Sequence, residues 1–359
     1  MCPLKRIAHW LVLSVVTAGL IIGCGLSAGN PSGNSPALKS TASSSSSCRW
    51  VKHDAGETQV CGQPQKVAAL SAYTLNLLLS LDQQPAGYAA PLNIYLGKVF
   101  NNPAQQIPYF GDRIITHPVN LGKSAAPSLE KLIALKPDLI VAEGNGDYSL
   151  LSQIAPTLIC QTRGQKGQWQ QSLRSLAIAL GKREKAEVVI QQHAANIARA
   201  RADLADSVAA HPKLLLLGSQ RLDQGLFAFT KDSDLVSLLG EVGFQLVSPP
   251  PGSVNLNMPV SVEKLPVFND ADSIIVLGYD TSIDQHQKPS NSESASELME
   301  KSQTQSIQQD WEASEIAQLL TASQEGRVFF ATIYKWLGIN PPIGAELVLE
   351  QLRQFFLSE

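Results

Sequence analysis

The segment "PSLEKLIALKPDLIVA" at residues 127–142 is the clearest indicator of the fold class. Ser128 is a natural helix N-cap, apolar residues recur at helical spacing after it, and a Pro-Asp pair ends the helix. The following "DLIVA" is a short apolar run of the kind found in buried strands. Helix, turn and buried strand together form one unit of a parallel α/β sheet.

A looser copy, "VSVEKLPVFNDADSIIVLG", occupies residues 260–278. It again places a serine, Ser261, two residues before a Glu-Lys-Leu sequence, and it again leads into an apolar strand. Glu130 and Glu263 therefore take the same second position in the two predicted helices. The repeat predicts two similar α/β lobes in one chain.

Short apolar runs alternate with helical stretches on both sides of residues 167–210, as in parallel α/β units. Residues 167–210 themselves predict an amphipathic helix that ends at Gly181, followed by a long helix without Gly or Pro. We therefore expect two Rossmann-like α/β lobes, residues 48–166 and 211–359, joined by this helical spine with its single long backbone helix. The Ser/Gln-rich segment 281–311 is predicted to be a surface insertion.

Residues 1–24 have the pattern of an export signal, because Lys5 and Arg6 precede a long apolar stretch that ends at Cys24. The small residues before Cys24 resemble a bacterial lipobox, in which the cysteine is lipidated and becomes the mature N-terminus. A plain membrane-anchor helix is the alternative, since the apolar stretch nearly reaches spanning length. Residues 25–47 are rich in Gly, Ser, Pro and Ala and are expected to form a flexible linker. Both alternatives place the folded part outside the cytoplasm, at the periplasmic face of an inner membrane or the outer face of a monoderm membrane.

Two cysteines, Cys48 and Cys61, lie at the ends of "CRWVKHDAGETQVC", whose centre predicts a hairpin turn. In an oxidising compartment this pair suggests a disulfide. Metal ligation is the competing interpretation, but no nearby Cys or His set completes a tetrahedral site. Cys160 ends an apolar run and is expected to be a buried core residue.

Composition and motifs exclude several classes of function. The net charge of −3 provides no positive field for nucleic acid, and the six histidines are too scattered to predict a site for a free metal ion. The chain has no Gly-x-Ser-x-Gly sequence, and "LGKSAAP" lacks the glycine that a phosphate-binding loop requires at the position of His117. No catalytic residue, metal site or cofactor is therefore predicted.

Taken in order along residues 48–359, the motifs resemble those of the periplasmic binding proteins of bacterial ABC importers for iron-siderophores, heme and vitamin B12. The resemblance is carried by "VAALSAYTLNLLLSLDQQPAGYA", "PSLEKLIALKPDLIVA", "LVSLLGEVGFQLV" and "GRVFFATIYKW". It implies a ligand cleft between the lobes and one glutamate on each lobe that docks on arginines of the permease dimer in the inner membrane. By motif position these are Glu130 and Glu263. A carboxylate in a first helical turn also interacts favourably with the helix dipole, so a purely structural role stays open.

The same resemblance implies an iron(III) chelate that is recognised through its outer atoms. Arginines would meet its negative charge, and aromatic side chains would meet its flat apolar surface. The predicted ligand-binding residues, at expected strand ends and loops, are Arg113, Arg221, Tyr279, Trp336, Tyr73, Tyr148 and Tyr334. A wider set adds Tyr95, Tyr109, Arg163, Phe227 and Phe229. Each of these residues could instead be a solvated arginine or a half-buried aromatic.

We therefore expect a monomeric substrate-binding lipoprotein of an ABC importer, which captures an iron(III)-siderophore or a related chelate and delivers it to the permease. Heme or cobalamin binding by the same fold is an alternative, in which Tyr73 or Tyr279 could supply the axial ligand of heme. From another class, the alternatives are a cell-envelope enzyme or an adhesin, and the adhesin would leave the cleft without a ligand.

Overall fold

The computed structural model describes residues 47–91, 97–144, 147–161, 167–229, 233–249, 259–279 and 293–357. The predicted lipidation site Cys24, nearly all of the linker, and the candidate ligand residues Tyr95 and Arg163 lie outside these ranges. Within the described residues, no helix is both long enough and apolar enough to span a membrane.

The chain of the first lobe begins with an antiparallel hairpin of β1 (Cys48–His53) and β2 (Gly56–Cys61). Gly56 has φ +130°, a value that L side chains rarely adopt, which explains a glycine at the predicted turn. The Cys48–Cys61 disulfide closes the open end of the hairpin, so this predicted bond is confirmed. Cys160 is buried, also as expected.

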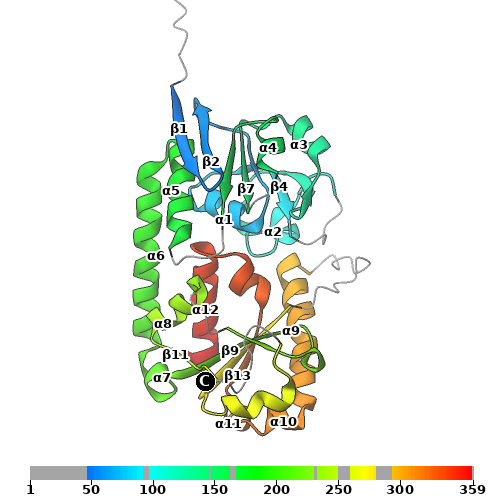
Figure 1. Cartoon of the computed structure of the whole chain (residues 1–359), viewed down its shortest axis with the longest axis vertical. Coiled ribbons are helices and arrows are strands. Elements are labelled where there is room, and N and C mark those ends of the chain that lie inside the picture. The colour runs from blue at the N-terminus through cyan, green and yellow to red at the C-terminus, as the bar shows by residue number, and fades with distance from the viewer. Residues whose placement is uncertain are drawn as a thin grey trace, which may run out of the picture. The chain divides into compact units, whose positions relative to one another are not determined.

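A six-stranded sheet in the order β6-β5-β4-β3-β7-β8 forms the centre of the first lobe (Figure 1). The neighbouring strands are parallel except β6, which pairs antiparallel with β5. The strands are β3 (Val67–Ala69), β4 (Pro85–Ala90), β5 (Val119–Lys123), β6 (Ala126–Pro127), β7 (Leu139–Glu143) and β8 (Thr157–Cys160). The helices are α1 (Ala72–Ser80), α2 (Pro103–Gln106), η1 (Gly111–Arg113), α3 (Leu129–Leu135) and α4 (Tyr148–Leu151).

Apolar side chains cover both faces of this sheet. In β7, Leu139 and Val141 belong to the core cluster shared with α1, whereas Ile140 and Ala142 belong to the cluster shared with α3 and α4. This arrangement explains the continuous apolar run in the sequence, because a parallel strand with helices on both faces has no polar side.

The second lobe repeats the plan with the sheet order β10-β9-β12-β13, and β11 also pairs with β9. All these pairings are parallel except that of β10 with β9. The strands are β9 (Lys213–Ser219), β10 (Phe227–Ala228), β11 (Gln245–Leu246), β12 (Ser273–Gly278) and β13 (Val328–Thr332). The helices are η2 (Leu222–Gln224), α8 (Asp234–Val242), η3 (Val262–Phe268), α9 (Ala295–Ala313), α10 (Glu315–Gln318), α11 (Thr321–Gln324), the π-helical turn η4 (Tyr334–Gly338) and α12 (Ile343–Leu357).

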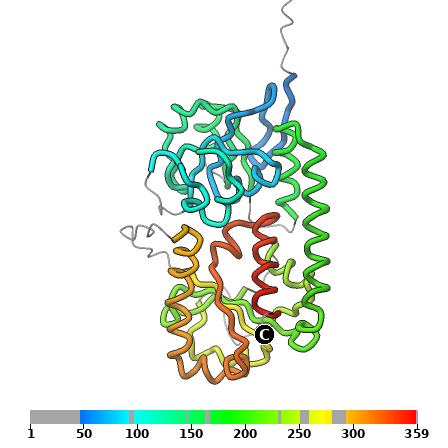
Figure 2. The backbone as a smooth tube through the Cα atoms, turned by 180° about the vertical axis from the view of Figure 1, so that it is seen from behind, coloured from blue at the N-terminus to red at the C-terminus, as the bar shows by residue number. Residues whose placement is uncertain are grey.

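The spine comprises α5 (Gln168–Leu180), α6 (Arg183–Asp203) and α7 (Ala205–Ala210). Gly181 ends α5 in a left-handed conformation with φ 70°, as its position predicts. Ala186 near the start of α6 packs in the first-lobe core, and Ile197 and Ala200 near its end pack in the second-lobe core. One helix therefore runs beside both lobes (Figure 2), and it ends at Asp203, within the stretch without Gly or Pro that predicts it.

The two copies of the repeated motif fold differently at their helices. The first forms α3 and β7 as predicted, and the Ser128 hydroxyl accepts a hydrogen bond from the Lys131 backbone N–H. The second forms β12, but its helix η3 is a 3₁₀ helix that contains Pro266. Because η3 has no side-chain cap hydrogen bond, the prediction that Ser261 caps an α-helix is wrong; its hydroxyl instead donates to the Glu263 carboxylate.

The prediction that 281–311 is a surface insertion is wrong for residues 295–311. Residues 295–311 belong to α9, which packs on β12 and β13. Trp311 is 2% exposed and Ile307 is fully buried, so this part of the segment belongs to the second-lobe core. Residues 281–292 lie outside the described ranges.

Candidate ligand pocket

A pocket of about 720 Å³ lies at the carboxyl ends of the first-lobe strands. Leu70 and Ser71 follow β3, Glu143 and Gly144 end β7, and Gln161 follows β8. Parallel α/β sheets commonly bind ligands at this edge, where the loops leave the strands. The remaining lining residues are Ser124, Ala125, Ala126, Pro127, Leu129, Ala142, Asp147, Leu150 and Leu151.

The pocket wall combines apolar surface with a few polar groups. Leu150 and Leu151 come from α4, and Ser124 holds its loop in place by donating its backbone N–H to Ala90 O at 2.8 Å. Ser71 starts α1 in a capping box, in which its hydroxyl accepts from Thr74 N at 3.1 Å. A wall that offers both apolar and polar surface can contact the carbons of an organic ligand and orient it by hydrogen bonds. Among the described residues, no cluster of three or more His, Cys, Asp or Glu is arranged to hold a metal ion.

None of the seven predicted ligand-binding residues lines this pocket. Tyr73, Trp336 and Tyr334 are 1%, 3% and 7% exposed. The Trp336 indole N–H donates to Gln351 Oε1 at 2.8 Å, and burial raises the pKa of the Tyr73 hydroxyl well above its usual range. These three aromatics act as core residues in this structure, because burial leaves them almost no surface for a ligand.

The other four predicted ligand residues keep part of their surface. Arg113 forms an ion pair with Glu346 of α12 at 2.9 Å, so its guanidinium links the lobes. Arg221 lies 3.4 Å from Asp223 and 3.8 Å from Asp310, with 53% of its side chain exposed. The described structure thus places both arginines beside carboxylates.

Two tyrosines complete this group. Tyr148 is half-buried in α4, and its hydroxyl lies 3.0 Å from Thr58 Oγ1 of the hairpin rather than in the pocket. Tyr279 is half-buried directly after β12, and its backbone N–H donates to Ser219 O at 3.3 Å. Tyr279 therefore lies at the carboxyl edge of the second-lobe sheet.

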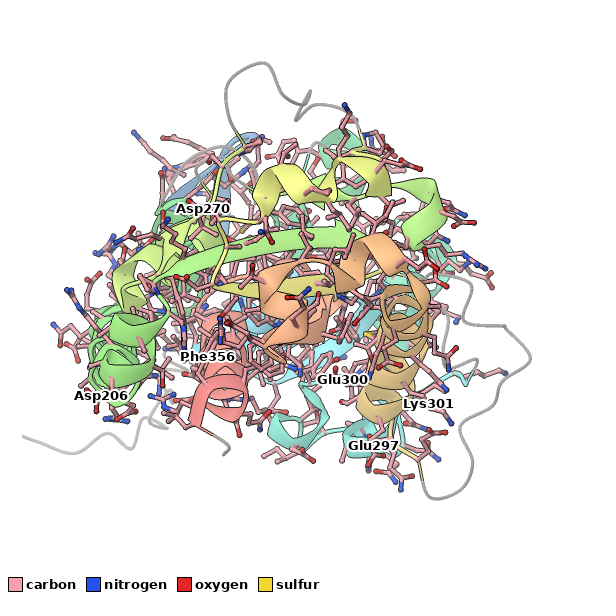
Figure 3. All side chains as sticks on the ribbon, turned by 90° about the horizontal axis from the view of Figure 1, so that it is seen from below. Asp206, Asp270, Glu297, Glu300, Lys301 and Phe356 are labelled. Atoms are coloured by element: carbon pink, nitrogen blue, oxygen red, sulfur yellow. A yellow bond between two sulfur atoms is a disulfide. The ribbon has the colours of Figure 1, made fainter. Side chains whose placement is uncertain are left out.

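Tyr109, from the wider candidate set, contacts the second lobe through its backbone N–H, its ring and its hydroxyl, which also lies 3.2 Å from Thr332 Oγ1 at the end of β13. It has φ 62° and stacks on Tyr334 with 5.8 Å between ring centroids. Its hydroxyl donates to Glu300 Oε1 at 3.0 Å, and Glu300 also pairs with Lys335. Figure 3 shows Glu300 on the inner side of α9 and Lys301 on the outer side. Tyr109 thus covers the end of β13 in the second lobe.

The polar pocket residues Glu143, Asp147 and Gln161 were not among the predicted ligand-binding residues. Their signal was present, since each is at or shortly after the end of an apolar run that predicts a parallel strand. The predicted ligand-binding residues were chosen as arginines and aromatics, so these shorter polar side chains were not included.

The proposed docking glutamates, Glu130 and Glu263, are both exposed, one on each lobe. Glu130 lies in the first turn of α3. The Ser261 hydroxyl, and then the backbone N–H of Glu263 itself, lower the pKa of the Glu263 carboxyl. Both carboxylates are accessible to a partner.

Comparison with known proteins defines the class to which these two lobes and this pocket belong. The sequence profile of a family described as "Periplasmic binding protein" matches residues 67–333. The chain therefore belongs to the periplasmic binding protein family, whose members are non-catalytic substrate-binding proteins of transport systems and work outside the cytoplasm.

Individual relatives and solved structures have low sequence identity to this chain. The Fe(3+) dicitrate-binding periplasmic protein FecB of Escherichia coli (strain K12) is 24% identical over 300 residues, which cover 82% of this chain and 85% of FecB. The structure of Staphylococcus aureus SirA complexed with staphyloferrin B has a TM-score of 0.61 and 22% identity, covering 85% of this chain and 97% of SirA. The siderophore binding protein BauB, bound to two molecules of acinetobactin and ferric iron, has a TM-score of 0.63 and 20% identity, covering 87% of this chain and all of BauB. These structures share the fold of two α/β lobes and a connecting helix.

Proposed function

We propose that this protein captures an iron(III)-siderophore, or a related iron(III) chelate, and delivers it to the permease of an ABC importer. The pocket at the carboxyl edge of the first-lobe sheet is the observation that carries the proposal. Relatives named for Fe(3+) dicitrate, Fe(3+)-citrate and siderophore binding support the same ligand class.

The proposed recognition uses the outer atoms of the chelate, because the siderophore already surrounds the iron with oxygen ligands. Leu150 and Leu151 would contact its apolar carbons, and Gln161 and Ser124 would hydrogen-bond to its polar groups. From the second lobe, Tyr279 and Arg221 stay candidates because each keeps exposed surface. Arg113 would have to exchange Glu346 for the ligand.

A panel of ferric chelates tests the proposal directly. The purified protein is titrated with ferric citrate, a ferric trihydroxamate and a ferric tricatecholate, and the quenching of its tryptophan fluorescence is followed, with calorimetry as the second method. We expect one chelate class to bind with a Kd of about 1 µM or tighter. Binding of none of the three would contradict the proposal.

Heme is the alternative ligand that the same titration separates. Tyr73, one of its two candidate axial residues, is 1% exposed, whereas Tyr279 is half-buried. A heme complex would therefore depend on Tyr279 alone, and Tyr279→Phe would remove its tyrosinate absorption band. No contact among the described residues favours heme over a ferric siderophore.

The proposed location is the outer surface of the cytoplasmic membrane, with Cys24 as the lipidated residue. Two relatives from Bacillus subtilis carry the word lipoprotein in their names. Replacing Cys24 by Ser should move the protein from the membrane fraction to the soluble extracytoplasmic fraction. Unchanged membrane retention would favour a plain helical anchor instead.

A further inference from the structure

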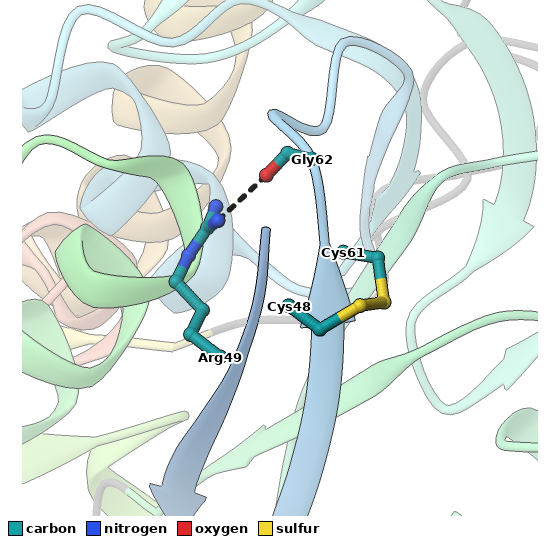
Figure 4. Close-up of a disulfide and its surroundings, with 4 residues drawn as sticks. All are labelled: Cys48, Arg49, Cys61 and Gly62. Atoms are coloured by element: carbon teal, nitrogen blue, oxygen red, sulfur yellow. Dashed lines mark hydrogen bonds between the residues drawn. A yellow bond between two sulfur atoms is a disulfide. The ribbon is translucent and has the colours of Figure 1, made fainter. Parts of the chain in front are cut away.

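The hairpin β1–β2 contacts elements of the pocket wall, although it lies before the residues 67–333 that match the family. Its disulfide closes one end (Figure 4), and Arg49 Nε donates to Ile178 O of α5 at 2.7 Å. A second guanidinium nitrogen donates to Gly62 O at 2.6 Å. The base of the hairpin is therefore fixed on α5, the first helix of the spine.

The turn end of the hairpin bonds the free edge of β8. Among the described residues this strand is the last in its sheet, so no described strand pairs with its outward N–H and C=O groups. Thr58 Oγ1 donates to Thr157 O at 2.8 Å, and the Asp54 backbone N–H donates to Ile159 O at 3.1 Å. Asp54 Oδ2 accepts the Gln161 N–H at 2.6 Å.

The hairpin bonds to Thr157, Ile159 and Gln161, which are every second residue along the chain. In a strand, every second residue directs its backbone N–H and C=O to the same edge. The last of them, Gln161, lines the pocket. The hairpin therefore fixes the strand up to the point where the pocket begins.

Thr58 also bonds to α4, the second element of the same pocket wall. Its hydroxyl proton goes to Thr157 O, so its oxygen accepts from the Tyr148 hydroxyl at 3.0 Å and from His53 Nε2 at 2.9 Å. His53 Nδ1 accepts from Ala55 N at 3.2 Å, which leaves the proton of the neutral ring on Nε2. Every donor in this network has one acceptor.

Tyr148 begins α4, the helix that supplies Leu150 and Leu151 to the pocket. Thr58 is 8% exposed, and its three partners lie on the hairpin, on β8 and on α4. A single hydroxyl thus ties the two elements of this wall to each other through the hairpin.

We infer that the disulfide-closed hairpin sets the position of the β8–α4 wall of the ligand pocket, and that Thr58 and Asp54 are positioning residues for ligand binding. The effect on affinity rests on the proposed function, but the effect on the wall does not. Neither residue touches the ligand in this scheme.

The variants separate positioning from general stability. Thr58→Val keeps the shape of the side chain and removes its oxygen, and Thr58→Ser restores the hydroxyl. Asp54→Ala removes the acceptor of the Gln161 N–H at an exposed position, so it serves as the second variant if Thr58→Val fails to fold. Lys52→Ala is the matched control, because Lys52 lies on the same hairpin, pairs only loosely with Glu57 at 3.7 Å and is 86% exposed.

The first measurement is amide hydrogen exchange of the ligand-free protein at a temperature well below unfolding. We expect about tenfold faster exchange in residues 147–161 for Thr58→Val and Asp54→Ala, and no change for Thr58→Ser and Lys52→Ala. Residues 273–278 of the second lobe serve as the internal reference. Unchanged exchange in 147–161 for both test variants would overturn the inference whether or not any chelate binds.

The second measurement is the Kd for the ferric chelate of the panel that the wild type binds best. We expect the Kd to rise about five- to tenfold in Thr58→Val and Asp54→Ala and to return to within about twofold in Thr58→Ser. If both variants unfold at lower temperature but bind with wild-type affinity and exchange normally in 147–161, the hairpin only stabilises the lobe.

Discussion

Exposure distinguishes Glu130 and Glu263 from the aromatic residues that the sequence also singled out. Both carboxylates lie on the surface in the first turn of a short helix, one on each lobe. Because each position also suits a helix start, stability alone cannot distinguish a docking residue from a structural one. A transport measurement can.

We predict that Glu130→Ala combined with Glu263→Ala lowers importer stimulation by at least about tenfold, since each lost charge pair at an interface slows association or speeds release. The Kd for the chelate should stay within about twofold of wild type. Glu184→Ala, which removes an exposed acidic residue from the first turn of α6, is the control. Wild-type transport by the double variant would exclude docking through these residues.

His193 predicts how stability responds to acid. Burial lowers its pKa, a nearby Glu241 carboxylate partly opposes this, and its ring meets Trp169 edge-on at 4.8 Å. The unfolded chain therefore binds a proton more tightly than the folded protein, so stability is lost as the pH falls below about 6.5. His53, whose pKa is also lowered by burial, acts in the same direction.

We expect His193→Gln to reduce the loss of unfolding free energy between pH 7.5 and 5.5 by up to about 1 kcal/mol. Urea denaturation followed by tryptophan fluorescence at each pH measures it. Each variant curve is compared with that of the wild type at the same pH. A steeper slope for His193→Gln would mean that the protonated ring is favoured in the folded state.

At the scale of elements, α9 shows what sequence patterning could and could not predict. Strands such as β7, β9, β12 and β13, and the helices α1, α3, α5, α8 and α12, follow from apolar runs and caps, whereas the short strands β5, β6 and β10 do not. Helix α9 was assigned to an insertion because its sequence is mostly Ser, Gln and Glu. Its capping box at Ser294 and Glu297 was the available signal, whereas the burial of Met299, Ile307 and Trp311 depends on packing against distant strands.

The candidate site was likewise predictable only in part. Strand ends were predictable, and with them the edge of the sheet that carries the pocket. The pairing of Arg113 with Glu346 was not predictable, because the two residues are more than two hundred positions apart in the sequence. The burial of Trp336 was not predictable either, because it depends on which face of α12 packs against it after folding. Residue type alone therefore overestimated the ligand contacts.

We predict that Trp311→Ala lowers the free energy of unfolding by about 3–5 kcal/mol, because it leaves a cavity under α9 and removes the indole hydrogen bond to Ser323. Trp50→Ala, at a residue 65% exposed on the hairpin, should cost less than about 0.5 kcal/mol. Chemical denaturation of both variants measures the difference. Equal small effects would mean that α9 is a dispensable insertion after all.

At the scale of the molecule, the described contacts join the lobes through more than the spine. Tyr334, Ile339 and Ile343 of the second half of the chain belong to the same core cluster as α1 and β3. Asn76 of α1 is fully buried. Its amide donates to the carbonyls of residues 339, 340 and 341, and its oxygen accepts the Ile343 N–H at 3.1 Å.

These shared contacts predict one cooperative unfolding transition for residues 48–359, with equal calorimetric and van't Hoff enthalpies. Asn76→Ala should lower the free energy of unfolding by about 2–3 kcal/mol, since it leaves several buried carbonyls without a donor. Asn76→Asp should cost more, because it points a carboxylate at the same carbonyls. Gln192→Ala, on the exposed face of α6, is the control and should have little effect. Two separate transitions in the wild type would show that the lobes unfold independently, and Asn76 would then stabilise only its own lobe.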